Sequence, residues 1–357
     1  MRWLVLQGHE RSLGSRDGHL VLFLRDEEVG RLHPTEVEEV HLLGDAVLTP
    51  MARRVLLQAD IPVLFLSPSG QLRGILQGPA SSAGDRRLAQ LRTVLDTDRR
   101  LALARDIVVG KLINQLVPLR RAHRAAPHEA LVDAQVAIAA TADAARSAPD
   151  LDVLRGLEGY GARVYFGAMR QMLRNPAFSF TSRSRRPPRD PVNAALSFLY
   201  TLLCTRTQRA AHLAGLDPYV GLLHDVGRGK PALALDLAEE WRPIVDAVVL
   251  RIFNQAQVGP DDFVHLAATR PAPAAPPEAE PDAEPDAEPE AVAGGVHLGN
   301  IARSIVLHAW DQRLRERSTS SHLDGRWALR DILDQQARHL SACFQDPALS
   351  YQPFPWR

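Results

Sequence analysis

The sequence predicts an α+β protein, in which a small, mainly β N-terminal domain precedes a larger, all-α C-terminal domain. Strand-sized apolar runs fill residues 1–78, whereas long amphipathic stretches rich in Leu, Ala and Arg follow residue 86. The length supports this division, because 357 residues exceed what one compact core usually organises.

The N-terminal domain is expected over residues 1–80, where short runs of alternating or branched apolar residues predict strands. Residues typical of turns separate these runs, and residues 49–59 have the cap and the periodicity of one helix. The small polar string PASSAGDR at residues 79–86 marks the boundary, so we assign residues 81–98 to a linker and first helix. The expected strands cover residues 3–6, 19–23, 37–43, 61–66 and 71–76.

The C-terminal domain is expected over residues 99–357. It contains one segment, PAPAAPPEAEPDAEPDAEPEAVA at residues 271–293, that predicts a disordered acidic insert, which we bound at 271–295. Helical periodicity resumes at Val296, so the insert interrupts the domain and its deletion should spare the fold. Helices are expected over residues 87–95, 99–116, 128–147, 152–173, 191–213, 218–226, 232–254 and 296–317.

The composition favours a folded, cytoplasmic protein. Apolar residues make up 45% of the chain and charged residues 24%, which is ordinary for a globular protein. No apolar run approaches the roughly 18 residues of a membrane span, and the N-terminal segment turns polar after Leu6. Cys204 and Cys343 are too few for a disulfide framework and lack the spacing of a zinc site. We therefore expect neither secretion nor a membrane partner.

The charge distribution is compatible with a polyanionic partner. The formal net charge is zero, yet seven acids fall within the insert, and the remaining chain has 42 basic residues against 35 acidic ones. Only Lys111 and Lys230 are lysines, so arginine supplies nearly all positive charge. Nucleotide composition bias and selection for phosphate contacts explain this usage equally well.

Glu158 is the first candidate for chemistry. On the helix expected over residues 152–173 it shares one face with Leu154, Ala162, Tyr165 and Met169. A carboxylate on such a stripe requires a cation, either an arginine or a metal ion. The nearby Gly156, Gly159 and Gly161 weaken the helix but allow a ligand or another backbone to approach. From this helix alone, a structural ion pair with an arginine is the favoured interpretation.

The second candidate region covers residues 215–243. We expect His224 to close the helix 218–226, and a basic turn to lead into a helix whose polar edge carries Asp236 and Glu239, with Glu240 leaning toward the apolar face. Imidazole and carboxylates without thiolates suit Mn²⁺ or Mg²⁺. On spacing alone, however, a histidine at a helix end and a solvated acidic face paired with Arg242 are favoured.

A third stretch, SRSRRPPRD at residues 182–190, concentrates arginines immediately before a helix. It is interpreted equally well as a clamp for phosphate groups and as a mobile solvated loop.

Several strings together resemble one family. LRGLEGYGARVYF at residues 154–166 is similar to the CRISPR adaptation integrases, the Cas-one family, and the strands that end in GDAVLTPMARRVLLQADIPVLFLSPSGQLRGIL resemble its β domain. The resemblance covers almost the whole chain. Further matches, in the family's order, are ARDIVVGKLINQ at 104–115, DPVNAALSFLYTLL at 190–203, GLDPYVGLLH at 215–224, LALDLAEEWRP at 233–243 and the helix near GNIARSIVLHAW.

The resemblance implies a site and a reaction. Glu158, His224 and Glu239 fall on the family's metal ligands and are the expected catalytic residues for Mg²⁺ or Mn²⁺, with Asp236 and Asn193 beside them. The implied reaction is a metal-assisted transesterification, in which 3′-hydroxyl ends of captured DNA are joined into the CRISPR repeat. The residues expected to hold the DNA backbone are Arg163, Arg183, Arg186, Arg228, Lys230 and Arg242.

The implied partners are double-stranded and branched DNA, a second copy of the chain held through the β domain, and a small second CRISPR adaptation protein that bridges two dimers. The sequence departs from the family in three places. Ala232 stands where a serine is common, Gly161 replaces a commoner alanine, and the acidic insert is no family feature. A non-catalytic DNA-binding scaffold of the same fold is therefore the alternative, and spacing alone also permits a phosphohydrolase for small phosphoesters.

Overall fold

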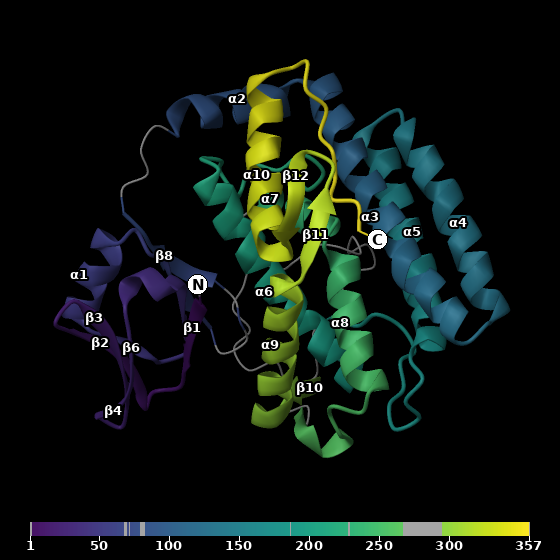
Figure 1. Ribbon diagram of the computed structural model, residues 1–357. Helices are drawn as coiled ribbons and strands as arrows, with labels where there is room; N and C mark the ends of the chain where they lie inside the picture. The colour runs from purple at the N-terminus through teal and green to yellow at the C-terminus, as the bar shows by residue number, and fades with distance from the viewer. Residues whose placement is uncertain are drawn as a thin grey trace. The chain divides into compact units, whose positions relative to one another are not determined.

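The computed structural model of the chain describes residues 2–67, 70, 72–78, 83–185, 187–227, 229–266 and 295–356. It divides into two compact units, Met1–Ala83 and Gly84–Arg357, which are taken one at a time below. The first unit is rich in strands and the second is predominantly helical, as the ribbon shows (Figure 1). The predicted fold class is confirmed.

The N-terminal unit contains two four-stranded sheets and helix α1 (Pro50–Gln58). In the first sheet, the parallel strands β1, β5 and β7 are followed by the antiparallel β8. Strands β2, β4 and β6 were not predicted, because the first two carry mainly polar or charged residues and the third has two residues. The sheet orders are β1(Arg2–Gln7)-β5(Val37–Leu43)-β7(Val63–Leu66)-β8(Leu72–Leu76) and β4(Glu27–Leu32)-β3(His19–Leu24)-β2(Arg11–Arg16)-β6(Val47–Leu48).

The core of this unit forms where alternating strand residues meet α1. Leu13, Leu20 and Val40 are buried there together with Leu56 of the helix. The helix begins where expected, since Thr49 accepts a hydrogen bond from the Ala52 backbone N–H and Pro50 occupies the first turn.

The C-terminal unit is built from nine helices within its described residues. Helices α3, α4 and α5 each pack against the other two, while α6 lies against α7, α8 and α10 (Figure 1). The bounds are α2 (Gly84–Leu95), α3 (Thr97–Ala125), α4 (Glu129–Arg146), α5 (Leu151–Met172), α6 (Pro191–Leu213), α7 (Ala232–Glu239), α8 (Arg242–Asn254), α9 (Asn300–Arg315) and α10 (Leu329–Gln345).

Two helix predictions in this unit were wrong. Residues 218–226 form turns and bends instead of a helix. The backbone N–H groups of Leu222, Leu223 and His224 donate to the Asp236 carboxylate, so they do not make the hydrogen bonds of a helix. The helix expected over residues 232–254 is divided into α7 and α8, and Pro243 lies in the first turn of α8, where its missing N–H costs no bond.

The C-terminal unit also contains two short antiparallel strand pairs, although an all-α domain was expected. Strand β9 (Phe263–Leu266) pairs with β10 (Gly295–Leu298), and β11 (Arg317–Ser320) pairs with β12 (Leu323–Ala328). Strands of four to six residues at the ends of helices carry too little periodicity to be separated from them in sequence. Helix α10 was likewise missed, beyond the last predicted helix.

The acidic insert predicted over residues 271–295 lies outside the described residues, except Gly295, which opens β10. The cross-strand partners Leu266 and Gly295 are the described residues on either side of residues 267–294. Among the described helices, none combines the length and the apolar character needed to cross a membrane.

Candidate functional site

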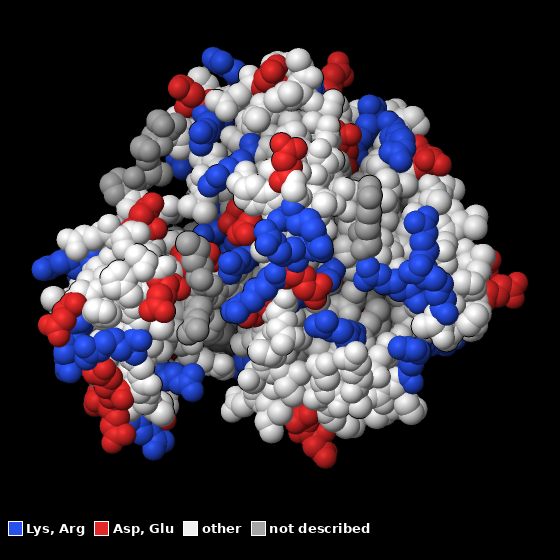
Figure 2. Space-filling view, viewed as in Figure 1, with Lys and Arg blue, Asp and Glu red and all other residues white. Residues whose placement is uncertain are grey.

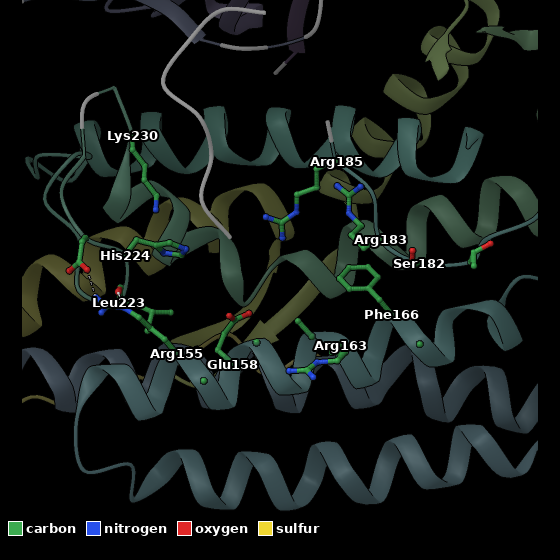
Figure 3. A pocket seen from close by; sticks show the side chains of 16 residues that line it. Arg155, Glu158, Arg163, Phe166, Ser182, Arg183, Arg185, Leu223, His224 and Lys230 are labelled. Carbon is green, nitrogen blue, oxygen red and sulfur yellow. Dashed lines mark hydrogen bonds and ion pairs between the residues drawn. The ribbon is translucent and has the colours of Figure 1, made fainter. Parts of the chain in front are cut away.

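A cavity of about 940 Å³ opens in the C-terminal unit between α5 and two loops. Helix α5 contributes one wall, and the segments 181–185 and 223–230 contribute the other two (Figure 3). Figure 3 shows the side chains of Glu158, His224 and Lys230 directed into this space. The charged residues that line the cavity are Arg155, Glu158, Arg163, Arg183, Arg185, Asp225 and Lys230, together with His224.

Glu158 reaches the cavity from the buried stripe of α5. Glu158 is only 4% exposed, and Leu154 and Tyr165 are buried on the same face of the helix. A Cβ at Gly161 would lie 2.3 Å from Leu112 Cδ2, so the absence of a side chain there lets α3 approach α5 closely. This glycine therefore serves helix packing at the site.

Lys111 on α3 is the cation that faces Glu158. Lys111 is 4% exposed. Its Nζ contacts Glu158 Oε1 and lies 2.6 Å from Glu239 Oε2. The requirement for a cation was correctly predicted, but the partner is a lysine where an arginine was favoured. One ammonium group thus joins two carboxylates from α5 and α7.

Sequence reasoning did not select Lys111 as a site residue, although a signal was present. It is one of two lysines in the chain and lies within ARDIVVGKLINQLVPL, a run whose neighbouring residues Val108 and Leu112 are fully buried. A lysine buried among such residues requires a counter-charge.

Glu239 is the last residue of α7 and has no exposed surface. Besides Lys111, its carboxylate meets Arg242 Nε at 3.0 Å. The expectation of a solvated acidic face was wrong, because every residue of α7 is buried, whereas the expected pairing with Arg242 is present at Glu239. The helix is enclosed because it contacts α6 and α3.

Asp236 organises the loop that carries His224. Its Oδ1 atom lies 2.7 Å from His224 Nδ1 and accepts the His224 backbone N–H at 3.0 Å, while Oδ2 accepts the N–H groups of Leu222 and Leu223. The loop approaches the start of α7 so closely that a Cβ at Gly221 would lie 2.7 Å from Ala232 Cβ, and it would also lie 2.7 Å from the His224 carbonyl oxygen. One carboxylate therefore fixes both the backbone and the ring of His224.

Glu240 has partners other than Lys111 and serves the core, as its predicted lean toward the apolar face implied. It accepts hydrogen bonds from the Phe354 backbone N–H at 2.7 Å, from Tyr351 Oη at 2.9 Å and from Gln336 Nε2 at 3.1 Å. Complete burial raises the pKa of this carboxyl to about 7. Glu239 and Glu240 are adjacent in sequence but enter different surroundings.

The predicted metal ligands are only partly gathered. Glu158 and Glu239 meet at Lys111, whereas His224 stands beside Asp236. Within the described part of the chain, no three His, Cys, Asp or Glu side chains already converge as a metal-binding group. The donor chemistry nevertheless suits a hard divalent cation, because two carboxylates surround a position taken by an ammonium group, and Asp236 orients the imidazole as carboxylates orient metal-bound histidines.

The structure places only some of the predicted DNA-contact residues at the cavity. Arg163, Arg183 and Lys230 line the cavity, but Arg242 is half-buried against Glu239 and over the ring of Tyr200, with its Cζ 4.8 Å from the ring centroid. Arg186 and Arg228 lie outside the described residues. Arg155 also lines the cavity and was not selected from the sequence.

Asn193 acts behind the cavity by holding the segment 182–184. Its Oδ1 accepts hydrogen bonds from Arg183 Nη1 at 2.8 Å and from the Ser184 backbone N–H, and its Nδ2 donates to the Ser182 carbonyl oxygen. Burial lowers the pKa of the Arg183 guanidinium to about 10. The half-buried side chain of Arg183 is thus anchored near the start of this arginine-rich stretch.

Comparison with known proteins gives one consistent result. The family model described as "CRISPR associated protein Cas1" matches residues 4–269. Two proteins of Thermus thermophilus named CRISPR-associated endonuclease Cas1 are 38% and 37% identical, the first over 90% of this chain and 86% of its own length, the second over 97% of both. A solved casposase bound to integration product has a similar fold, with a TM-score of 0.78 at 20% identity, over 99% of this chain and 93% of that one.

Proposed function

Since this chain belongs to the Cas1 family of CRISPR-associated proteins, we propose that it is a spacer-acquisition integrase. It would act as a metal-dependent DNA endonuclease and transesterase that joins 3′-hydroxyl ends of captured DNA into the CRISPR repeat. The two Thermus thermophilus relatives are both named endonucleases, which supports an enzyme. The observation that carries the proposal is the meeting of Glu158 and Glu239 at one buried cation, beside a cavity lined by arginines.

We propose Glu158, His224 and Glu239 as the residues that would hold Mg²⁺ or Mn²⁺. Such an ion polarises a phosphate and lowers the cost of ionising an attacking hydroxyl. Asp236 contacts His224 Nδ1, so Nε2 would be the ligating atom of the ring. Lys111 contacts both of these carboxylates.

The cavity arginines would position the substrate. Arg163, Arg183 and Arg185 lie along the same cavity as Glu158, and Lys230 enters it from the loop that follows His224 (Figure 3). Guanidinium groups match phosphate oxygens in charge and geometry, and such contacts fix the register of DNA without identifying its bases. We therefore expect binding that depends strongly on salt.

The proposed partners are double-stranded and branched DNA, a second copy of this chain, and a small second adaptation protein that bridges two dimers. Family membership supports them. The β-rich unit, with its two sheets, is the proposed dimer contact.

The proposal is tested by Glu158→Ala and His224→Ala, which should abolish joining of DNA 3′ ends in Mn²⁺ or Mg²⁺ while DNA binding survives. The adjacent carboxylates offer a matched pair, because Glu239→Gln should inactivate the protein and Glu240→Gln should not. Activity in both alanine variants would refute the site. A wild-type protein that binds DNA but never joins it would favour the non-catalytic scaffold.

A further inference from the structure

A second cleft in the C-terminal unit gathers arginines around a tryptophan. Its volume is about 410 Å³, and none of the described residues that line it also lines the first cavity. The end of α3, the end of α9 and the β11–β12 hairpin form its walls, and Figure 2 shows basic side chains gathered near this hairpin. The lining residues are Arg121, Arg313, Glu316, Arg317, Ser318, Thr319, Arg326, Leu329 and Trp356. We call it the Trp356 cleft.

Trp356 organises two of these arginines. The Cζ atoms of Arg121 and Arg313 lie 4.9 and 5.4 Å from the centroid of the indole ring, within the range of cation–π attraction. The ring is itself fixed, because Trp356 is 5% exposed and its backbone N–H donates to Asn114 Oδ1 at 3.0 Å. The two guanidinium groups are therefore held in place before any ligand arrives.

The other two arginines are held by the hairpin. Arg317 Nη2 donates to the Arg326 carbonyl oxygen and Arg326 Nη2 donates to the Arg317 carbonyl oxygen, each at 2.8 Å. These acceptors are neutral, so the bonds orient both side chains without cancelling their charge. A rigid pair of cations results, because each arginine fixes the other across the β11–β12 ladder.

Positive charge exceeds negative charge in the Trp356 cleft. Its lining has four guanidinium groups and one carboxylate, that of Glu316, which contacts Arg313. Burial lowers the pKa of Arg121, and Arg124 lowers it further. Burial also lowers the pKa of Arg313, where Arg121 and Arg251 oppose the effect of Glu316. An anion bound in the cleft would relieve the repulsion between these neighbouring guanidinium groups.

We propose that the Trp356 cleft binds the phosphodiester backbone of DNA at a position separate from the candidate metal ligands. The inference rests on the proposed function, which supplies the polyanion. Forked guanidinium donors and the hydroxyl groups of Ser318 and Thr319 match phosphate oxygens. Phosphates recur along each strand, so a strand held here would extend beyond the reacting phosphate, and the contacts would contribute affinity without reading sequence.

The test measures the affinity of a fluorescent branched DNA in EDTA as the NaCl concentration is varied. Arg317→Gln with Arg326→Gln should weaken binding about 10-fold at low salt and make the slope of log K against log [NaCl] shallower by about 1 to 2. The control is Arg315→Gln, at the last residue of α9, which pairs with Asp311 at 2.7 Å and does not line the cleft. It should leave both quantities unchanged.

Thermal unfolding of each variant shows whether the hairpin remains folded, and the single variant Arg121→Gln, on α3, tests the cleft without altering the hairpin. Unchanged affinity and slope in the double variant and in Arg121→Gln would overturn the proposal. Binding of poly-glutamate is measured on the same variants. If they lose poly-glutamate binding but keep DNA binding, the proposal is also overturned, because that result would indicate an acidic protein partner. Joining of DNA ends by these variants is assayed separately. If the cleft does not bind DNA, the proposed joining reaction is unaffected. If the wild type binds no DNA at all, both the cleft proposal and the proposed function are refuted.

Discussion

Replacement of Lys111 by methionine tests whether the ammonium group occupies the position of the metal ion. In the wild type, Lys111 Nζ joins the buried carboxylates of Glu158 and Glu239, and Glu239 also meets Arg242. Methionine keeps much of the side-chain volume but removes the charge. The variant therefore leaves two buried carboxylates with one fewer cation.

The expected magnitude follows from the burial of all three groups. Removing one partner of a buried ion pair costs about 3–5 kcal/mol, so the variant should lose about that much unfolding free energy in EDTA. A divalent ion that binds only the folded state restores about 2.7 kcal/mol at a free concentration 100 times its Kd. Mn²⁺ should therefore recover about half or more of the loss, and it should bind the variant more tightly because it displaces no ammonium group.

Urea unfolding with EDTA or Mn²⁺ measures the first effect, and calorimetric titration with Mn²⁺ measures the second. Lys230→Met is the matched control, since Lys230 lines the cavity without an ion pair to Glu158 or Glu239 among the contacts of the described residues. It should change neither the unfolding free energy in EDTA nor the Mn²⁺ affinity appreciably. Equal destabilisation of Lys111→Met with and without Mn²⁺, at unchanged Mn²⁺ affinity, would refute the reasoning.

Three other outcomes are expected. Glu240 has its pKa raised from 4.5 to about 7, so the folded state holds the proton more tightly and stability falls as pH rises through this window, by about 3 kcal/mol. Glu240→Gln should remove that slope, and parallel unfolding curves for both proteins from pH 4.5 to 7.5 would contradict it. Gly221→Ala places a Cβ 2.7 Å from the His224 carbonyl oxygen, so the loop must shift. We expect the unfolding free energy to fall by about 1–3 kcal/mol and the joining activity to fall at least about 10-fold. Wild-type values in both assays would disprove this role of Gly221. Replacing residues 267–294 with Asn-Gly should preserve the circular dichroism spectrum and leave the unfolding free energy equal or about 1–2 kcal/mol higher, because Leu266 and Gly295 already face each other; non-cooperative unfolding would count against it.

Local signals in the sequence were sufficient for much of the fold. Helix α6 was predicted to the residue, because Asp190 caps it through the Asn193 backbone N–H and Pro191 opens its first turn. Residues 218–226 carry comparable signals, with Asp217 before Pro218, yet they form no helix. The carboxylate of Asp236, beyond the end of this segment, takes their N–H groups, and no local propensity encodes that competition.

The candidate site shows the same division. Burial of Glu158 on an apolar face was sufficient to predict a cation opposite it, because that requirement is independent of the fold. The identity of the cation was not predictable, since Lys111 comes from another helix, and its second partner, Glu239, is far from both in sequence. The resemblance pointed to Glu239, the expected lean of Glu240 toward the apolar face favoured the same choice, and the structure gives the two residues different partners.

The scarcity of lysine makes this chain well suited to spectroscopy. Its two lysines are Lys111, enclosed between carboxylates, and Lys230, at the wall of the same cavity. Isotope-labelled lysine would therefore give two side-chain resonances, and both would report on the candidate metal centre. Amine-reactive reagents should distinguish them, because they reach Lys230 readily and reach Lys111 only when its carboxylate partners release it. The arrival of an ion or of DNA could then be followed at atomic resolution without introducing any foreign probe.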